Sequence, residues 1–173
     1  MPPPLIALGA DIQLDSENGE RWIALQDFFV DYKKTVLAPG EFIRAVRVPR
    51  PQANEKLFIY KISKRLDDDI SAVLGAFWLQ FDGDTVGDCR LAFGGMAATP
   101  ARALQTENAL KGQPWNKNSV ATAIKVLGSD FSPLSDVRAS ASYRLQVAGN
   151  LLRRAWLSSD SLPRQQLTVT DYA

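Results

Sequence analysis

The chain has 173 residues, a formal net charge of +1, and 46% hydrophobic against 23% charged residues, the balance of a soluble globular protein. Its 20 basic and 19 acidic residues are interspersed, which argues against a nucleic-acid partner, and no apolar run approaches the ~20 residues that cross a bilayer. The chain has no histidine and a single cysteine, Cys89, which excludes Ser-His-Asp and Cys-His catalysis, zinc ribbons, internal disulfides and an iron–sulfur cluster built from this chain alone.

The first forty residues predict a β-hairpin. The opening Met1-Pro2-Pro3-Pro4 lacks the basic and then apolar layout of a secretory signal, so we expect a cytoplasmic protein. Residues 5–14 are mostly aliphatic and predict a strand, Asn18-Gly19 a tight turn, and residues 20–25 the returning strand. The Pro39-Gly40 pair is a turn signal and predicts a boundary between two parts of the chain.

From Glu41 the pattern is typical of β-strands. The expected strands cover residues 42–48, 57–63, 72–81 and 86–93. Asp82-Gly83-Asp84 predicts a hairpin turn between the last two, and such short connections favour an antiparallel sheet.

After Gly94-Gly95 the apolar period changes from two to about 3.6, which indicates helices. We expect one helix from Thr99, as its cap, to Lys111, a second around 120–128, and a third from Ser135-Asp136 to about Leu157. Strands followed by helices predict an α+β fold, in which three helices cover one face of an antiparallel sheet of three to four strands. The polar residues 159–173 predict a flexible tail.

The segment from Lys61 to Ile70 has the most unusual composition, because three basic residues precede three consecutive aspartates. Two interpretations stay open on spacing alone: a solvated turn that neutralises its own charge, or a loop that faces a cofactor. The other candidates for a functional role are interpreted as structural. Gly94-Gly95 predicts a strand-to-helix turn, Arg144 a tie between helix and sheet, and Cys89 a buried filler.

Four motifs occur in a fixed order along the chain. They begin at Phe28-Phe29-x-x-Tyr32-Lys33-Lys34-Thr35 with Pro39-Gly40-Glu41, at Tyr60-Lys61-Ile62-Ser63-Lys64-Arg65, at Phe93-Gly94-Gly95-Met96-Ala97, and at Pro133-Leu134-Ser135-Asp136-x-Arg138 with Tyr143-Arg144. This order resembles the flavin domain of the xanthine dehydrogenase and CO dehydrogenase flavoprotein family, and the resemblance covers about residues 5–157.

The resemblance implies two lobes and a partial FAD site. Residues 1–40 would be the C-terminal remnant of the FAD-binding lobe, with its closing hairpin, and residues 41–158 the C-terminal α+β lobe, followed by the tail 159–173. In the family, an aliphatic residue after the Pro-Gly-Glu turn and the lysine of the second motif contact the flavin. They map onto Ile43 and Lys61.

The loop after this lysine passes beside the flavin ring in the family. It maps onto Arg65, Asp67 and Asp68. The resemblance implies that this loop governs the access of NAD and the flavin potential, because a basic group favours the negative charge of a reduced flavin and an acidic group opposes it.

The resemblance implies a xanthine dehydrogenase, in which electrons from purine oxidation reach FAD through iron–sulfur clusters and then NAD. Iron–sulfur clusters and molybdopterin would belong to missing segments or to a large partner subunit. The family's FAD phosphate-binding segment lies upstream of the residues matched here, so we expect the isolated chain to be inactive. The alternatives are the flavin subunit of a CO dehydrogenase or an aromatic-CoA reductase, or an interaction module without cofactor.

Overall fold

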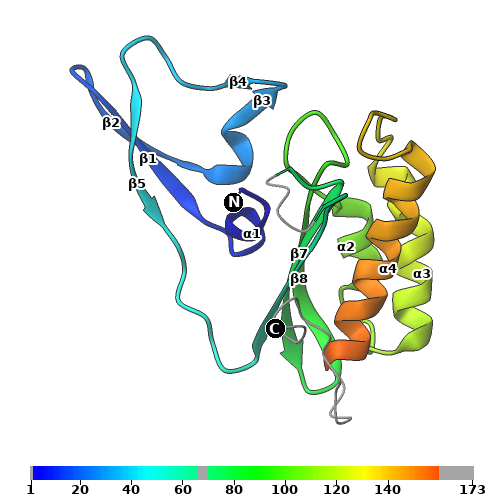
Figure 1. Cartoon of the computed structure of the whole chain (residues 1–173). Coiled ribbons are helices and arrows are strands. Elements are labelled where there is room, and N and C mark those ends of the chain that lie inside the picture. Colours follow the sequence, from blue (N-terminus) through cyan, green and yellow to red (C-terminus); the bar gives the residue numbers. More distant parts are fainter. Residues whose placement is uncertain (1, 66–69, 160–173) are drawn as a thin grey trace, which may run out of the picture.

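A computed structural model describes residues 2–65 and 70–159, which build two lobes joined by an extended linker (Figure 1). The first lobe contains the helix α1 (Pro2–Ala7), a 3-10 turn at Leu25–Asp27, and the strands β1 (Asp11–Ser16), β2 (Gly19–Ala24), β3 (Phe29–Asp31), β4 (Lys34–Thr35) and β5 (Phe42–Arg47). The second lobe contains the strands β6 (Glu55–Ile62), β7 (Val73–Asp82), β8 (Thr85–Gly94) and β9 (Ala101–Arg102), and the helices α2 (Leu104–Leu110), α3 (Lys117–Asp130) and α4 (Ala141–Ser159).

The N-terminal hairpin is present, but it is shorter than expected and a helix precedes it. β1 and β2 pair antiparallel from Asp11↔Ala24 to Ser16↔Gly19. The expectation of a strand from residue 5 is wrong for the part that forms α1. Its three prolines lie at or near the first turn, where the missing N–H groups have no helical acceptor, and Gly9, with φ +70°, ends the turn that follows.

β5 belongs to the first sheet, whose strand order is β2-β1-β5. It pairs with β1 through Leu14↔Ile43 and Ile12↔Val46. A division of the chain at residue 40 therefore separates β5 from the sheet that it completes. Alternation along β5 predicts a strand, but it carries no information about which sheet the strand joins.

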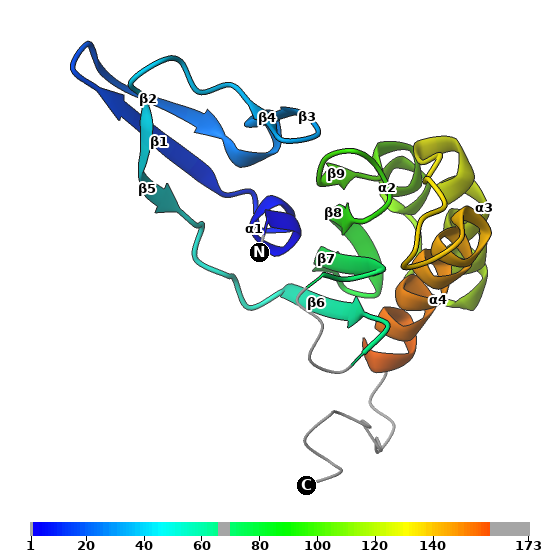
Figure 2. The same cartoon turned by 45° about the horizontal axis from the view of Figure 1, so that its top comes forward.

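The second sheet has the order β6-β7-β8-β9 and is antiparallel throughout. The expected hairpin between β7 and β8 is confirmed, with Asp82 opposite Thr85. Figures 1 and 2 show α2, α3 and α4 on one face of this sheet and α1 on the other. The α+β fold with three helices on one sheet face is thus confirmed.

The burial of β7 on both faces explains its nearly continuous apolar sequence. Because side chains alternate along a strand, Phe77 and Leu79 pack toward the three helices, whereas Ala76 and Trp78 pack toward α1 and the first lobe. β7 is therefore the shared wall of two hydrophobic cores.

The helix boundaries differ from the expected ones where tertiary contacts intervene. α2 begins at Leu104 rather than near Thr99, because Ala101 and Arg102 pair with β8 as β9. α4 begins at Ala141 rather than at Ser135-Asp136, and α3 continues to Asp130.

In the described part of the chain no helix combines the length and apolar character needed to cross a membrane. The expected flexible tail lies outside the described residues, apart from Ser159 at the end of α4.

Candidate functional site

β6 presents an uncovered apolar row on the sheet face that α1 covers elsewhere. Phe58, Tyr60 and Ile62 pack toward the helices, so the alternating residues Leu57, Ile59 and Lys61 point to the opposite face. There Ile59 is 48% exposed, although it lies directly across from the buried Ala76 of β7. In strand order β6 is the edge of its sheet.

β5 provides a second uncovered edge. Ile43 and Val46 lie opposite Leu14 and Ile12 of β1, and paired residues of antiparallel strands share a sheet face. Leu14 and Ile12 are buried in the core between the lobes, yet Ile43 is 46% and Val46 is 48% exposed. The inner face of the first sheet therefore ends in exposed aliphatic side chains.

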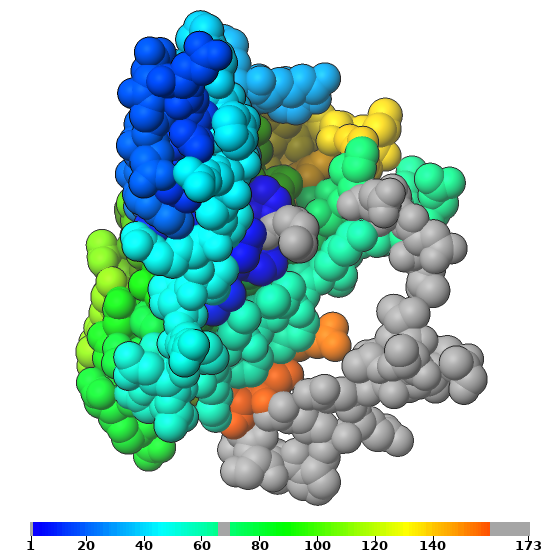
Figure 3. All heavy atoms as spheres, turned by 90° about the vertical axis from the view of Figure 1, so that its left-hand side faces the viewer, coloured from blue at the N-terminus to red at the C-terminus, as the bar shows by residue number. Residues whose placement is uncertain are grey.

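The helix α1 lies recessed between these two edges. Figure 3 shows blue α1 in a hollow between the cyan segment that contains β5 and the teal segment that contains β6. Arg90 of β8 holds the end of α1, because its Nε donates to the carbonyl oxygen of Ala7 at 2.7 Å. The Arg90 guanidinium carbon also lies 3.8 Å from the ring centroid of Trp78. We define the surface formed by Ile43, Val46, Leu57, Ile59 and Lys61 as the inter-lobe surface.

Lys61 and Arg65 lie at the end of β6. Lys61 is exposed and pairs in register with Leu74, and the carbonyl oxygen of Arg65 accepts a hydrogen bond from the Ser63 hydroxyl at 2.9 Å. Asp67 and Asp68 lie outside the described residues. Of the residues expected at the flavin, the structure thus places Ile43 on β5, an edge strand of the first sheet, and Lys61 at the end of β6, an edge strand of the second.

The Glu of the Pro-Gly-Glu turn has a structural role that sequence reasoning missed. Both Glu41 oxygens accept hydrogen bonds from Arg21, each at 2.8 Å, and one also accepts from the Ala38 N–H at 2.7 Å. The Arg21 hydrogen bond, aided by the Ala38 N–H, lowers the pKa of Glu41 to about 2. This pair holds the turn from which β5, and with it Ile43, begins.

The fourth motif is also structural, as expected for Arg144. The Arg144 side chain is buried and donates to the carbonyl oxygens of Ala72 and Gly95 and, at 2.6 Å, to Asp136. Asp136 also accepts from the N–H groups of Arg138 at 2.9 Å and Ala139 at 3.1 Å. Hydrogen bonds from these backbone groups and from Arg144 lower the pKa of Asp136 to about 2.

Cys89 is a buried filler and not a nucleophile. It is fully buried in the core beneath α2, and burial, with the nearby Glu107 charge, raises the pKa of its thiol to about 12. The thiolate is therefore scarcely populated at neutral pH.

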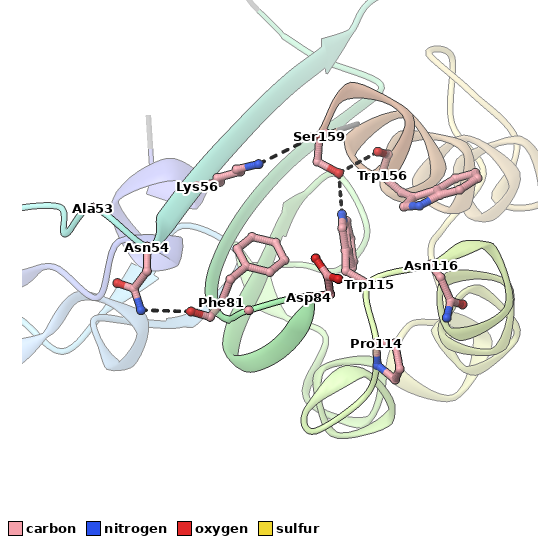
Figure 4. Close-up of a pocket in the computed structure, with 11 residues that line it drawn as sticks. Ala53, Asn54, Lys56, Phe81, Asp84, Pro114, Trp115, Asn116, Trp156 and Ser159 are labelled. Carbon is pink, nitrogen blue, oxygen red and sulfur yellow. Dashed lines mark hydrogen bonds between the residues drawn. The ribbon is translucent and has the colours of Figure 1, made fainter. Parts of the chain in front are cut away.

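A separate cavity of about 750 Å³ lies at the far end of the second sheet, near the β7–β8 turn (Figure 4). Phe81, Trp115 and Trp156 line it, and the Trp115 indole N–H donates to the Ser159 hydroxyl at 2.6 Å. Lys56 donates to the Ser159 carbonyl oxygen at 3.5 Å. These contacts fasten the C-terminal end of α4, and the register of β6 places the cavity at the opposite end of the strand from Lys61.

Two family descriptions match the two lobes. Residues 58–159 match the CO dehydrogenase flavoprotein C-terminal domain, and residues 1–51 match the FAD-binding domain in molybdopterin dehydrogenase. The chain belongs to this flavoprotein family. The first range ends within the linker after β5 and the second begins inside β6, so β5 falls in the same range as the sheet that it pairs with.

Curated relatives match along most of the chain. A nicotinate hydroxylase of Emericella nidulans is 35% identical over 90% of this chain and 12% of its own length. The xanthine dehydrogenase/oxidase of Gallus gallus is 33% identical over 76% of this chain and 10% of its own. The carbon monoxide dehydrogenase medium chain of Afipia carboxidovorans is 30% identical over 90% of this chain and 54% of its own.

The fold agrees with a solved structure of the same family. Carbon monoxide dehydrogenase from Hydrogenophaga pseudoflava, in a form that lacks the Mo-pyranopterin moiety, superimposes with a TM-score of 0.83 and 29% identity. The match covers 88% of this chain and 53% of that chain. The chain thus spans about half the length of the medium chains, and a tenth or so of the longer relatives.

The inter-lobe surface fits one side of a flavin. An isoalloxazine ring is flat and largely apolar on its faces, and its pyrimidine end carries acceptor oxygens and the negative charge of the reduced state. Leu57, Ile59 and Ile43 supply aliphatic surface, and Lys61 supplies a cation at the end of the row.

Proposed function

We propose that the chain forms one wall of the FAD site in a molybdenum hydroxylase, with Ile43 and Lys61 in contact with the flavin ring and Arg65, Asp67 and Asp68 on the loop beside it. The observation that carries this proposal is the inter-lobe surface, which presents exposed aliphatic side chains and a lysine on the two edge strands beside α1, in a chain whose family binds FAD. Exposed aliphatic side chains on uncovered sheet edges are candidates for a ligand-binding surface.

The residues of the wall would act by binding and by charge. The aliphatic side chains of Ile43, Leu57 and Ile59 would exclude water from the ring face, which strengthens the electrostatic effect of a neighbouring cation. Lys61 would donate to the acceptor oxygens of the ring and favour its reduced, negatively charged form. A bound flavin supplies the redox chemistry itself.

We further propose that the parent enzyme is a xanthine dehydrogenase, which passes electrons from a molybdopterin subunit through iron–sulfur clusters and FAD to NAD. The second motif, with Lys64 and Arg65 before three aspartates, favours this assignment. A CO dehydrogenase is the second candidate, because its separate medium chain is a relative of which this chain covers 54%. Hypoxanthine-dependent reduction of NAD by the assembled enzyme supports the first, and carbon monoxide oxidation without it supports the second.

The flavin contact of Lys61 is testable on the full chain with two ligands. We expect Lys61→Ala to weaken binding of both riboflavin and FAD about tenfold, the loss of one charge-assisted hydrogen bond. Riboflavin lacks the phosphates, so an equal loss for both ligands assigns the contact to the ring. Titration monitored by flavin fluorescence measures the two dissociation constants.

The matched control is Lys125→Ala, which removes an exposed lysine from α3 on the opposite side of the sheet. This variant is expected to bind both ligands as the parent chain does. Unchanged binding by Lys61→Ala, or a loss for FAD alone, would contradict a contact between Lys61 and the ring.

A further inference from the structure

Arg144 joins three segments that are distant in the sequence. It lies in the first turn of α4 and is only 4% exposed. One terminal nitrogen donates to the carbonyl oxygens of Ala72 and Gly95, and the other donates to Asp136. Because a guanidinium presents its donors in a fixed plane, these bonds hold their three acceptors in one arrangement.

The two carbonyl groups mark the same end of the second sheet. Ala72 immediately precedes β7, and Gly95 immediately follows β8. Gly95 has φ +80°, and a Cβ added there would collide with the Ala72 carbonyl oxygen. The close approach that lets one guanidinium reach both carbonyls therefore requires glycine at this position.

This end of the sheet also carries Lys61. The Ala72 N–H donates to the Ile62 carbonyl oxygen at 2.8 Å, so the residue held by Arg144 is hydrogen-bonded to the residue that follows Lys61. Beyond the strand, the Lys64 ammonium donates to the Val137 carbonyl oxygen at 3.3 Å. The segment from Asp136 to Arg144 thus contacts both Lys64, which follows β6, and Ala72, which is hydrogen-bonded to the last residue of β6.

We propose that Arg144 is a positioning residue that fixes the end of β6 and thereby the place of Lys61 on the inter-lobe surface. Arg144 acts through the Ala72 carbonyl and the Ala72–Ile62 hydrogen bond. Asp136 orients the guanidinium toward the two carbonyl groups by accepting a hydrogen bond from its other terminal nitrogen. The consequence for flavin binding rests on the proposed function, whereas the fixing of the strand end does not.

The first experiment measures the strand end in the full chain without any ligand. Arg144→Lys keeps the charge but cannot reach both carbonyls and Asp136 in one plane. We expect amide hydrogen exchange at Ala72 to accelerate at least about tenfold, while the amides of α3 change less than about twofold. Asp136→Asn, which leaves Arg144 in place, is expected to produce a smaller change at the same amide.

The second experiment asks whether the effect passes through Lys61. We expect Arg144→Lys to weaken riboflavin binding roughly fivefold in the parent chain and less than about twofold in a chain that already carries Lys61→Ala. A purely structural role would lower affinity by the same factor in both backgrounds. Arg153→Lys, on an exposed face of the same helix, is the matched control.

Exchange at Ala72 that matches the parent chain would overturn the proposal, and so would equal losses of affinity in the two backgrounds. If Lys61→Ala alone leaves riboflavin binding unchanged, the proposed function fails. The exchange of Ala72 in Arg144→Lys and Asp136→Asn then still decides whether Arg144 fixes the strand end.

Discussion

At the scale of single residues, burial sets how completely a charged group must be hydrogen-bonded. Lys61 is exposed at the end of β6, whereas Glu107 is 1% exposed beneath β8. Glu107 accepts two hydrogen bonds from Arg102, at 3.0 and 2.6 Å, and one from the Leu91 N–H at 2.7 Å. A carboxylate so enclosed is stable only because every one of these donors reaches it. Arg102 also donates to Gln26 of the first lobe at 3.0 Å, so the buried pair links the two lobes.

Removal of this buried carboxylate is expected to be costly. Glu107→Ala removes the carboxylate that pairs with Arg102 and leaves the Leu91 N–H without its acceptor, and the free energy of unfolding should fall by about 3–5 kcal/mol. Urea denaturation measures the change. Glu17→Ala, in the exposed β1–β2 turn, should stay within about 0.5 kcal/mol of the parent chain. Similar losses for both variants would show that the buried pair contributes little.

At the scale of elements, strand pairing and glycine turns determine where strands and helices begin and end. α2 starts at Leu104, two residues after β9 ends, and β8 ends at Gly94, one residue before Gly95 with its positive φ. Neither boundary follows from apolar periodicity, because both depend on a segment that packs from elsewhere in the fold.

Two glycines allow a direct comparison of these effects. Gly95→Ala forces a side chain into a positive φ and against the Ala72 carbonyl, and it should lower the free energy of unfolding by about 1–3 kcal/mol or more. Gly128 lies within α3 with no heavy atom within 4 Å of an added Cβ. Gly128→Ala should therefore raise stability by about 0.5–1 kcal/mol. Thermal denaturation of the two variants in parallel checks that one loses stability and the other gains it. A change of stability in the same direction for both would refute the explanation from backbone conformation and space.

At the scale of the whole molecule, the two lobes share one of the two hydrophobic cores. Residues of α1 and β1 pack with Ala76, Trp78 and Ala92 of the second sheet in that core. Arg90 adds a polar contact to it, from β8 to the Ala7 carbonyl oxygen. The inter-lobe surface exists because this core stops short of the edges at β5 and β6.

Arg90 is therefore expected to couple the lobes. Arg90→Ala removes a charged hydrogen bond and a cation–π contact, and the free energy of unfolding should fall by about 2–4 kcal/mol. Hydrogen exchange should increase in α1 and β1 more than in α3, because only the first two depend on the contact between lobes. Arg50→Ala, in the exposed linker, serves as the control. A uniform increase across the chain would contradict this coupling.

The sequence by itself determined the fold class, the β7–β8 hairpin, the three covering helices and the family. Their signals are local: Asp82-Gly83-Asp84 needs only its neighbours to turn, and a 3.6-residue apolar period needs only its own helix. The structural roles of Cys89 and Arg144 were also predictable, since the first lacks a nearby base and the second begins a helix beside a sheet.

Only the tertiary structure decided that Pro2–Ala7 is a helix, that β5 completes the first sheet, and that Ile43 and Lys61 lie exposed on the edge strands of two different sheets. Each depends on a partner far along the chain. α1 is too short to be stable by itself and forms against β7 and β8, and β5 selects β1 through hydrogen bonds that its own alternation does not encode. Local pattern specifies which elements form, whereas contacts between distant segments specify where a side chain such as Lys61 finally points.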